Sequence, residues 1–328
     1  MTVASSKRPL LEVKDLVKRF DIRTGLFGSV TGRVHAVELV SFDIAPGETL
    51  AVVGESGCGK STLARMLALL DTPTAGQIRI EGEAASASNP ATRRAVQMVF
   101  QDPYGSLNPR QTVGAILEEP LLIAGEPPAA RRQAALAMMA NVGLRPDQLG
   151  RYPHQFSGGQ RQRIAIARAL MLHPKVVIAD EPVSALDVSV RAQVLNLLIE
   201  LQDRLGLAYV FISHDLGVVR HMADEVAVMY LGRIVEQAPR EVLFDQPRHP
   251  YTRALLAATP GLVPRAGEAE PVRGEPPSPI TPPSGCHYHT RCPHVQAVCR
   301  EAIPLIRPVG ETQVACHFAE ALPTIASA

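Results

Sequence analysis

Short apolar runs alternate with longer amphipathic stretches along most of the chain. Residues 48–54 (ETLAVVG), 175–180 (KVVIAD) and 208–213 (AYVFIS) are compact and apolar, as buried strands are. Residues 60–70 and 190–205 instead repeat their apolar positions at helical spacing. Buried strands that alternate with helices predict an α/β domain built on a largely parallel sheet.

Other segments alternate polar and apolar residues one by one, which predicts half-buried strands. Residues 10–20 (LLEVKDLVKRF) have this pattern and are predicted to form an edge strand, and residues 77–82 (QIRIEG) repeat it. Residues 225–237 (EVAVMYLGRIVEQ) predict a hairpin that turns at Leu231 and Gly232. These segments add strands to the predicted core.

The pattern changes twice along the chain, and each change suggests a boundary. A mostly helical stretch interrupts the series of strands and predicts a helical subdomain at about residues 103–170. Residues 260–283 are rich in proline, glycine and glutamate and are typical of a linker. We therefore expect a main α/β domain over residues 1–248 and a C-terminal extension over residues 249–328.

Composition narrows the classes of function. The 328 residues are 46% hydrophobic, which is ample for a packed core. The net charge of +1 gives no strong electrostatic attraction to nucleic acid. Tryptophan is absent and aromatic residues make up 4% of the chain, so a base-stacking nucleic-acid partner is not expected. The sequence has no apolar run long enough to span a bilayer and begins with no secretory signal, which predicts a protein on the cytoplasmic side.

The segment GESGCGKST matches the phosphate-binding pattern G-x-x-x-x-G-K-[ST]. Its glycines let several backbone N–H groups face one point, Lys60 adds a cation for the β- and γ-phosphates, and the Ser61 hydroxyl can bind Mg²⁺. A buried strand before the loop and a helix after it are the context that such a loop requires. The residues predicted to bind nucleotide here are Gly54, Glu55, Ser56, Gly57, Cys58, Gly59, Lys60, Ser61 and Thr62.

The segment VVIADEP, residues 176–182, supplies the acidic partner that this loop needs. Its apolar residues end in Asp180 and Glu181 at the carboxyl end of a predicted strand. We expect Asp180 to order the Mg²⁺ shell and Glu181 to act as the base for the water that attacks the γ-phosphate. An acidic pair that merely caps a helix is the alternative.

With these motifs in this order, and with Gln101 in VFQDP, FSGGQ at 156–160, SALD at 184–187 and His214 in FISHD, the chain resembles the ATP-binding subunits of ABC transporters over about residues 10–250. The resemblance implies a P-loop NTPase core with an antiparallel β subdomain and a helical insert. It also implies ATP hydrolysis, with Gln101, Glu181 and His214 as catalytic residues and Mg²⁺ bound by Ser61, Gln101 and Asp180.

In this family two ATP-binding subunits pair head to tail, so the resemblance implies that FSGGQ serves the nucleotide of the partner. The residues concerned are Ser157, Gly158, Gly159 and Gln160, and their alternative role is an ordinary helix N-cap. Asp187 would cross the dimer interface. Phe20 is the candidate to stack on adenine, and Phe27 competes with it.

Within the family, VFQDPYGSLNPRQTV and HPYTRALLAATP resemble the F-type ATPase of oligopeptide/dipeptide importers. This resemblance implies a heterodimer with a D-type ATPase, two membrane permeases, an extracytoplasmic substrate-binding protein, and a peripheral position on the cytoplasmic face of the membrane. Import of nickel or another small solute is the alternative within the class. A soluble ABC-type ATPase in DNA repair or translation is the alternative outside it.

The last part of the chain holds four of its five cysteines, Cys286, Cys292, Cys299 and Cys316. Their spacing, C-x5-C-x6-C-x16-C, is wider than that of zinc knuckles. Thiolates in this number can hold an iron–sulfur cluster or a zinc ion, and the importer subgroup implies a [4Fe–4S] cluster. Free cysteines remain the alternative to either metal site.

Overall fold

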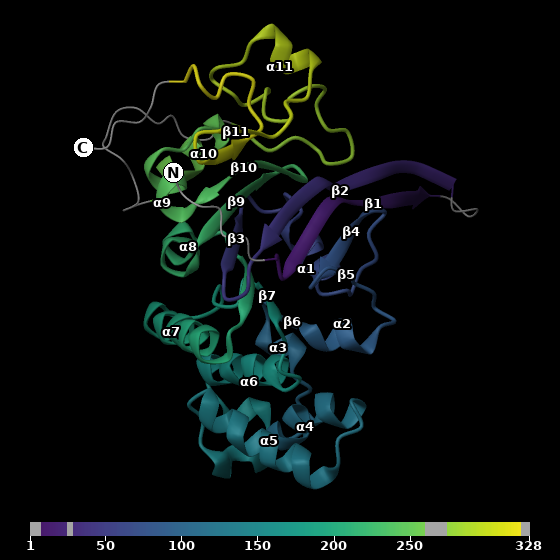
Figure 1. Cartoon of the computed structure of the whole chain (residues 1–328), viewed down its shortest axis with the longest axis vertical. Coiled ribbons are helices and arrows are strands. Elements are labelled where there is room, and N and C mark those ends of the chain that lie inside the picture. The colour runs from purple at the N-terminus through teal and green to yellow at the C-terminus, as the bar shows by residue number, and fades with distance from the viewer. Residues whose placement is uncertain (1–7, 25–28, 260–273, 323–328) are drawn as a thin grey trace.

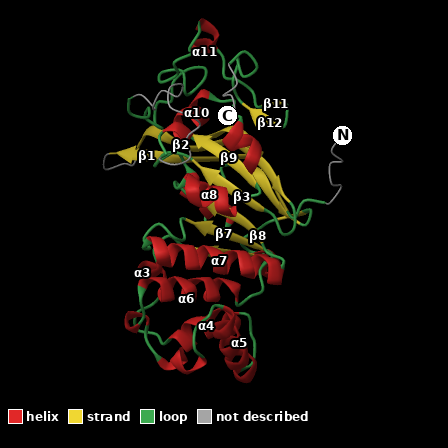
Figure 2. Ribbon diagram, turned by 90° about the vertical axis from the view of Figure 1, so that its left-hand side faces the viewer, coloured by secondary structure: helices red, strands yellow, loops and turns green. Residues whose placement is uncertain are grey.

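The computed structural model of the chain describes residues 8–24, 29–259 and 274–322. Its strands form two sheets, and helices cover both faces of the larger one (Figures 1 and 2). The helical subdomain and the C-terminal extension lie at opposite ends of the long axis (Figure 1). In the part of the chain that is described, none of the helices combines the length and the apolar character needed to cross a bilayer.

The larger sheet has the order β11-β12-β10-β9-β3-β8-β7-β6, and its strands from β9 to β6 are parallel. This confirms the predicted α/β core. The antiparallel pair β9 and β10 turns at Leu231 and Gly232, as the hairpin pattern predicts. The strands of this sheet are β3 (Thr49–Val53), β6 (Val96–Val99), β7 (Val176–Asp180), β8 (Ala208–Ile212), β9 (Glu225–Tyr230), β10 (Arg233–Pro239), β11 (Arg307–Val309) and β12 (Thr312–Val314).

The smaller sheet is antiparallel and has the order β2-β1-β4-β5. Its strands are β1 (Leu11–Thr24), β2 (Ser29–Ile44), β4 (Ala75–Ile80) and β5 (Glu83–Ala84). Because β1 pairs with both β2 and β4, the prediction that residues 10–20 form an edge strand is wrong. The alternating pattern reports that one face of a strand is buried, and it carries no information on whether both edges are paired.

The described helices include one at each of the two predicted stretches, residues 60–70 and 190–205. They are α1 (Lys60–Leu67), α2 (Pro90–Ala95), α3 (Pro103–Ser106), α4 (Val113–Ile123), α5 (Pro128–Asn141), α6 (Gly158–Leu170), α7 (Val188–Leu205), α8 (Leu216–Met222), α9 (Arg240–Asp245), α10 (Pro250–Ala257) and α11 (Ala297–Glu301). Two 3₁₀ turns, η1 (Pro146–Gly150) and η2 (Pro153–Gln155), lie between α5 and α6.

The core strands send alternate side chains into two separate apolar clusters. Val176 and Ile178 of β7 pack with α1 and the smaller sheet, whereas Val177 and Ala179 pack with α6 and α7. A strand that is buried on both faces must be apolar at every position, which explains its short continuous apolar run. The carboxyl ends of β3, β7 and β8 therefore meet at one edge of the sheet, where the loops that follow them carry the predicted site.

The C-terminal extension is built onto this core. Strand β12 pairs with β10, so the β11–β12 hairpin extends the larger sheet at its edge. Tyr288 is buried against Tyr230 and Tyr251, and these three rings join the extension to the core. The predicted linker lies mostly outside the described residues, which resume at residue 274.

Candidate functional site

The loop between β3 and α1 lies along a cavity of about 590 Å³. Within the 54–62 loop, the residues that line the cavity are Ser56, Gly57, Gly59, Lys60, Ser61 and Thr62. The remaining residues of the loop, Gly54, Glu55 and Cys58, lie behind it. Gly54 has a φ of 153°, and a Cβ there would lie 2.1 Å from the carbonyl oxygen of Met229, so only glycine fits.

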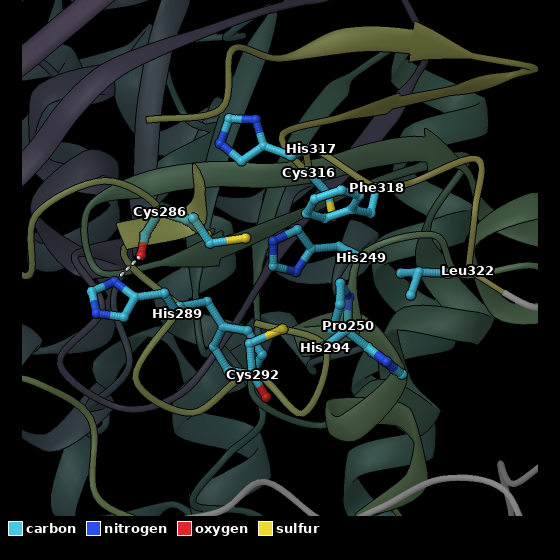
Figure 3. A pocket seen from close by; sticks show the side chains of 12 residues that line it. His249, Pro250, Cys286, His289, Cys292, His294, Cys316, His317, Phe318 and Leu322 are labelled. Carbon is cyan, nitrogen blue, oxygen red and sulfur yellow. Dashed lines mark hydrogen bonds between the residues drawn. The ribbon is translucent and has the colours of Figure 1, made fainter. Parts of the chain in front are cut away.

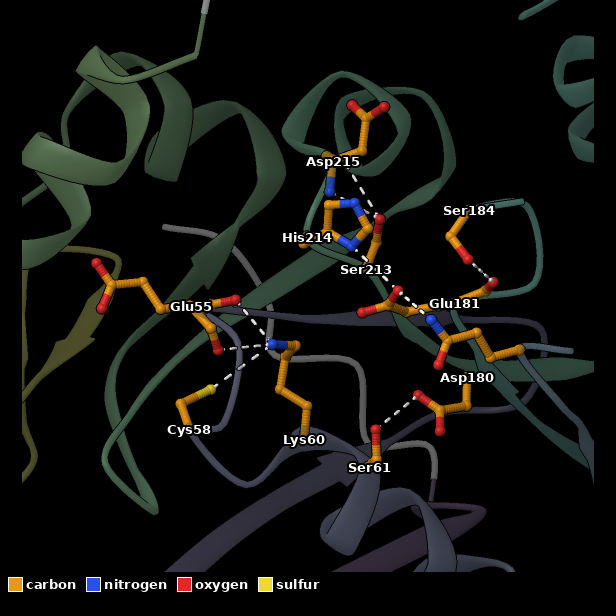
Figure 4. A network of polar contacts seen from close by, with 12 residues as sticks. Glu55, Cys58, Lys60, Ser61, Asp180, Glu181, Ser184, Ser213, His214 and Asp215 are labelled. Atoms are coloured by element: carbon orange, nitrogen blue, oxygen red, sulfur yellow. Dashed lines mark hydrogen bonds and ion pairs between the residues drawn. The ribbon is translucent and has the colours of Figure 1, made fainter. Parts of the chain in front are cut away.

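Lys60 is the buried cation of the loop. Its Nζ donates hydrogen bonds to the carbonyl oxygens of Gly54, at 2.8 Å, and Glu55, at 2.9 Å (Figure 4). The Cys58 thiol packs in the core beside it, and burial raises the pKa of that thiol. A protonated, buried thiol packs as a small apolar side chain does.

Ser61 and Asp180 bring two oxygen donors together at the start of α1. The Ser61 hydroxyl donates to Oδ1 of Asp180 at 3.4 Å. Burial raises the pKa of Asp180, and the neighbouring Glu181 raises it further, whereas the bond from Ser61 opposes the shift. A carboxylate that is costly to ionise and lies beside a hydroxyl is suited to a hard divalent cation such as Mg²⁺.

Glu181 is held by two side chains that come from other strand ends. Nε2 of Gln101 donates to its Oε2 at 3.0 Å, and Nδ1 of His214 lies 3.1 Å from the same oxygen (Figure 4). Glu181 has a φ of 45°, unusual for a residue with a side chain, and its N–H is bonded to the carbonyl of Ile212. The carboxylate is thereby fixed at the cavity wall, which Gln101, Glu181 and His214 all line.

Phe20 lines the end of the same cavity with its strand partner Val34. Phe20 is 41% exposed, and Nζ of Lys18 lies 5.0 Å from its ring centroid. The competing candidate, Phe27, lies outside the described residues. Pro279, which the sequence did not single out, completes this wall from the C-terminal extension.

The second glycine-rich segment stands apart from the cavity. Ser157 is the N-cap of α6: its Oγ accepts from the Gln160 N–H, and Oε1 of Gln160 accepts from the Ser157 N–H. A Cβ at Gly159 would lie 2.2 Å from Cγ1 of Val190, so the packing of α6 on α7 requires that glycine. The four residues from Ser157 to Gln160 do not line the cavity of their own chain. Asp187 is likewise exposed, at the N-cap of α7.

The four cysteines of the extension line one small pocket. Cys286, Cys292, Cys299 and Cys316 share it with several histidines, among them His249, whose buried Nε2 has no hydrogen-bond partner (Figure 3). Burial raises the pKa of Cys286 and Cys292 to about 11. In the described part of the chain no three Cys, His, Asp or Glu side chains are arranged as a metal site, so the predicted [4Fe–4S] cluster or zinc ion is not supported by their placement.

The thiols nevertheless provide the right chemistry for such a group, because four of them from separate segments face one enclosure. The enclosure measures about 20 Å³, about the space of a single water molecule. The donor set fits a cluster, and the spacing of the donors as placed does not.

Sequence reasoning missed the residues that hold the phosphate loop from behind. The Tyr251 hydroxyl accepts a hydrogen bond from the Glu55 N–H at 2.9 Å, and Arg291 forms a two-bond ion pair with the Glu55 carboxylate. Tyr251 lies in the segment HPYTR, which the sequence analysis used only as a mark of resemblance. Nothing in the sequence near Arg291 signals its partner.

Two family models match parts of this sequence. Residues 37–184 match the family model described as ABC transporter, and residues 235–299 match that of the oligopeptide/dipeptide transporter C-terminal region. The di/tripeptide transport ATP-binding protein DppF of Pseudomonas aeruginosa is 53% identical over 317 residues, which cover 95% of this chain and 98% of the relative. The oligopeptide transport ATP-binding protein AppF of Bacillus subtilis is 50% identical over 327 residues, which cover 96% of this chain and 99% of the relative.

Among solved structures, the ATP-binding cassette MJ0796, determined as a dimer in a post-hydrolysis state with ADP and Pi, has a TM-score of 0.61. It is 28% identical, and the match covers 70% of this chain and 98% of that structure. The likeness confirms the predicted fold of the core.

Proposed function

The chain belongs to the ATP-binding subunits of ABC transporters, in the oligopeptide/dipeptide group, and from this premise we propose that it hydrolyses ATP to drive uptake of short peptides through separate permeases. The observation that carries the proposal is one cavity at the carboxyl edge of the sheet. There a buried lysine, a Ser–Asp oxygen pair and a fixed glutamate meet. These are the groups that phosphoryl transfer to water requires: a cation for the phosphates, oxygen ligands for Mg²⁺ and a base for the water.

The 54–62 loop holds the phosphates of ATP in this proposal. Its backbone N–H groups and the N-terminus of α1 face the β- and γ-phosphates, and Lys60 neutralises their charge. Ser61, Asp180 and Gln101 are the residues that would hold Mg²⁺, and Ser61 and Asp180 already lie within hydrogen-bonding distance of each other. When bound, the ion supplies positive charge against the phosphate oxygens.

Hydrolysis is assigned to Glu181 as the base that takes a proton from the attacking water. The bonds to Gln101 and His214 hold its carboxylate at the cavity wall, so little reorganisation is needed before the reaction. His214 contacts the γ-phosphate, and Gln101 links the site to the helical insert. Phe20 stacks on adenine at the other end of the cavity.

The second half of the site comes from another subunit. Ser157, Gly158, Gly159 and Gln160 cap α6 and leave its N-terminus outside the cavity of their own chain, where it can close over a triphosphate that a partner holds. Asp187 crosses the same interface. We propose a D-type ATPase as the partner in a heterodimer.

The permeases are expected to dock on the helical insert. Leu122 and Ile123 at the end of α4 are 56% and 77% exposed, and they offer apolar surface for a membrane subunit's cytoplasmic helix. An extracytoplasmic binding protein would deliver the cargo. The chain itself would sit on the cytoplasmic face, held there by the permeases.

We also propose that the four cysteines hold a [4Fe–4S] cluster, with zinc as the alternative metal. Their convergence on one pocket from four positions in the extension supports this proposal. Such a group would secure the extension by a few strong bonds, because residues 274–322 form little regular structure of their own. Iron and acid-labile sulfide analysis of protein purified without oxygen tests it, and protein free of both elements would refute it.

The whole proposal is tested by purifying the complex through a tag on this chain and placing it in liposomes. We expect integral membrane subunits in the complex and ATP-dependent uptake of a labelled dipeptide, lost when Lys60 is replaced by alanine. Uptake of nickel without uptake of peptide would favour the alternative cargo. A tagged chain that brings no membrane subunit with it would favour a soluble ATPase.

A further inference from the structure

The C-terminal extension reaches back to the phosphate-binding loop through a single arginine. Nη1 and Nη2 of Arg291 donate to the two carboxylate oxygens of Glu55 at 2.8 and 3.0 Å, across 236 positions of sequence. The Arg291 side chain is only 6% exposed and that of Glu55 is 25% exposed. A buried, two-bond pair of this kind fixes geometry as well as charge.

The arginine is itself held in place by the extension and the core. It donates to the carbonyl oxygen of Gly274 at 3.0 Å and to the Tyr230 hydroxyl at 3.4 Å. A guanidinium stays protonated in proteins, so these bonds hold a positive charge behind the loop. Arg291 is therefore a fixed cation at the back of the loop.

The backbone of Glu55 is anchored to the same block of residues. Its N–H donates to the hydroxyl of Tyr251 at 2.9 Å, and the Tyr251 ring packs against Tyr230 and Tyr288 at centroid distances of 4.6 and 5.4 Å. Both ends of Glu55 are thus tied to a packed aromatic cluster, which links the loop to the extension.

What Glu55 fixes is the position of Lys60. The carbonyl oxygens of Gly54 and Glu55 both accept from the Lys60 ammonium, so the orientation of these two peptide groups sets where that cation lies. The Glu55 carboxylate points away from Lys60 and does not line the cavity (Figure 4). Its side chain serves as an anchor for the loop and makes no contact with the space that the nucleotide would fill.

The extension also lines the cavity directly. Pro279 lines it beside Phe20, and the carbonyl oxygen of Pro279 accepts from the His35 N–H at 2.9 Å. One short segment of chain therefore holds the 54–62 loop through Arg291 and lines the cavity through Pro279.

From this geometry we infer that Arg291 is a positioning residue for ATP binding: through Glu55 it holds the phosphate-binding loop in shape, and the C-terminal extension is part of the nucleotide site. The inference rests on the proposal that residues 54–62 hold the triphosphate. It deepens that proposal by making the affinity for ATP depend on a residue outside the ABC transporter match, which ends at residue 184.

The test is binding of MgATP to the full chain by calorimetry, in a Glu181→Gln background so that nucleotide is not consumed. Arg291→Met keeps the length of the side chain and removes the charge, and Arg291→Lys keeps the charge and loses the two-bond geometry. Glu55→Gln disturbs the other partner of the ion pair. The double variant, Arg291→Met with Glu55→Gln, completes a double-mutant cycle. Arg307→Met is the matched control, because Arg307 pairs with Glu320 in the same extension.

We expect Arg291→Met to raise the dissociation constant about tenfold, because a buried partner is left unpaired and the loop loses its anchor. Glu55→Gln should weaken binding in the same direction. The double variant should bind no more weakly than Arg291→Met alone, Arg291→Lys should lie between, and Arg307→Met should match the parent.

A dissociation constant that is unchanged in both Arg291→Met and Glu55→Gln, with only the melting temperature lowered, would show that the pair is structural and would overturn the inference. Glu55→Gln keeps the test valid if the Arg291 variants fail to fold. Lys60→Ala separates a failure of the inference about Arg291 from a failure of the proposed ATP site. If it abolishes binding while the Arg291 and Glu55 variants bind normally, only the inference fails, and if it binds normally, the proposed site itself fails.

Discussion

Two helices begin at glycine-rich segments, residues 54–62 and 156–160, and the two segments lie in different surroundings. The first lines a cavity that residues from the loops after β6, β7 and β8 also line. The second uses its Ser157–Gln160 capping box to satisfy the N–H groups of those two residues, and it stands outside that cavity. Similar local sequence therefore leads to an assembled half-site in one case and to an outward-facing helix end in the other.

Under the proposed function, this difference separates the part of the site that one chain supplies from the part that we expect a second chain to supply. Glu181, Gln101 and His214 are already in contact within one chain. The N-terminus of α6 offers backbone N–H groups and a positive dipole that no group of the 54–62 cavity uses. A second subunit that brings its own triphosphate would use both.

The largest expected effect lies in the first region. Glu181→Gln keeps the bond from Gln101 and removes the base, so we expect ATP turnover by the assembled transporter to fall by about a hundredfold to ten-thousandfold. ATP-dependent pairing of the two ATPase subunits should remain. Turnover at the parent rate, in a complex that carries the change at both sites, would rule out Glu181 as the base.

The next largest effect is expected in the second region, residues 156–160. Ser157→Ala should slow turnover by about tenfold to a hundredfold, which is the loss expected for a hydrogen bond to a charged group. Binding of MgATP to the isolated chain should be unchanged. Ser157→Asn is the control, because asparagine caps helices well but lacks the hydroxyl. If the asparagine variant turns over like the parent while the alanine variant does not, Ser157 acts only as a cap.

A smaller effect defines how far the first region extends. Phe20→Ala should weaken MgATP binding to the isolated chain about fivefold, at the low end of base–aromatic stacking because Phe20 is 41% exposed. Phe20→Tyr keeps the ring and should bind normally. An unchanged dissociation constant in the alanine variant would move the adenine contact to another residue.

The smallest functional effect is expected at Glu236, which lies outside both regions. Burial raises the pKa of this carboxyl to about 6 from its ordinary value of 4.5, although it accepts bonds from the N–H groups of Arg248 and His249. The folded state thus holds the proton more tightly. The stability that this gives is fully present below about pH 4.5 and is lost as the pH rises through about 6.

Glu236→Gln should remove that part of the pH dependence. Between pH 4.5 and pH 7 the free energy of unfolding of the parent should fall by about 2 kcal/mol more than that of the variant, measured by urea unfolding of the full chain. MgATP binding at pH 7 should be unaltered. Parallel pH profiles for the two proteins would show that folding does not raise the pKa of Glu236.

The phosphate end of the site was predictable because its information is local. Gly54, with a φ of 153° against a neighbouring carbonyl, and the lysine and hydroxyl that follow it six and seven positions later belong to one short segment. The meeting of Glu181 with Gln101 and His214 was also foreseeable, since each follows a buried strand of a parallel sheet. Their carboxyl ends lie at the same edge.

The contact between Arg291 and Glu55 was not predictable, because it joins distant segments and is not local information. Arg291 and Glu55 are 236 positions apart, and no period or motif in either segment encodes that contact. Strand β12 joins the edge of the larger sheet although its three residues are too few to show a pattern. For the cysteines, spacing could suggest a shared enclosure, but it could not give the distances between the thiols.

The central claim is that the N-terminus of α6 completes the ATP site of another subunit. The most direct measurement is a structure of the whole transporter with MgATP, trapped by Glu181→Gln. The account predicts that the Ser157 hydroxyl and the N–H groups of Gly158 and Gly159 lie within hydrogen-bonding distance of a γ-phosphate held by the partner's phosphate-binding loop. A loaded transporter in which residues 156–160 remain far from every triphosphate would contradict it.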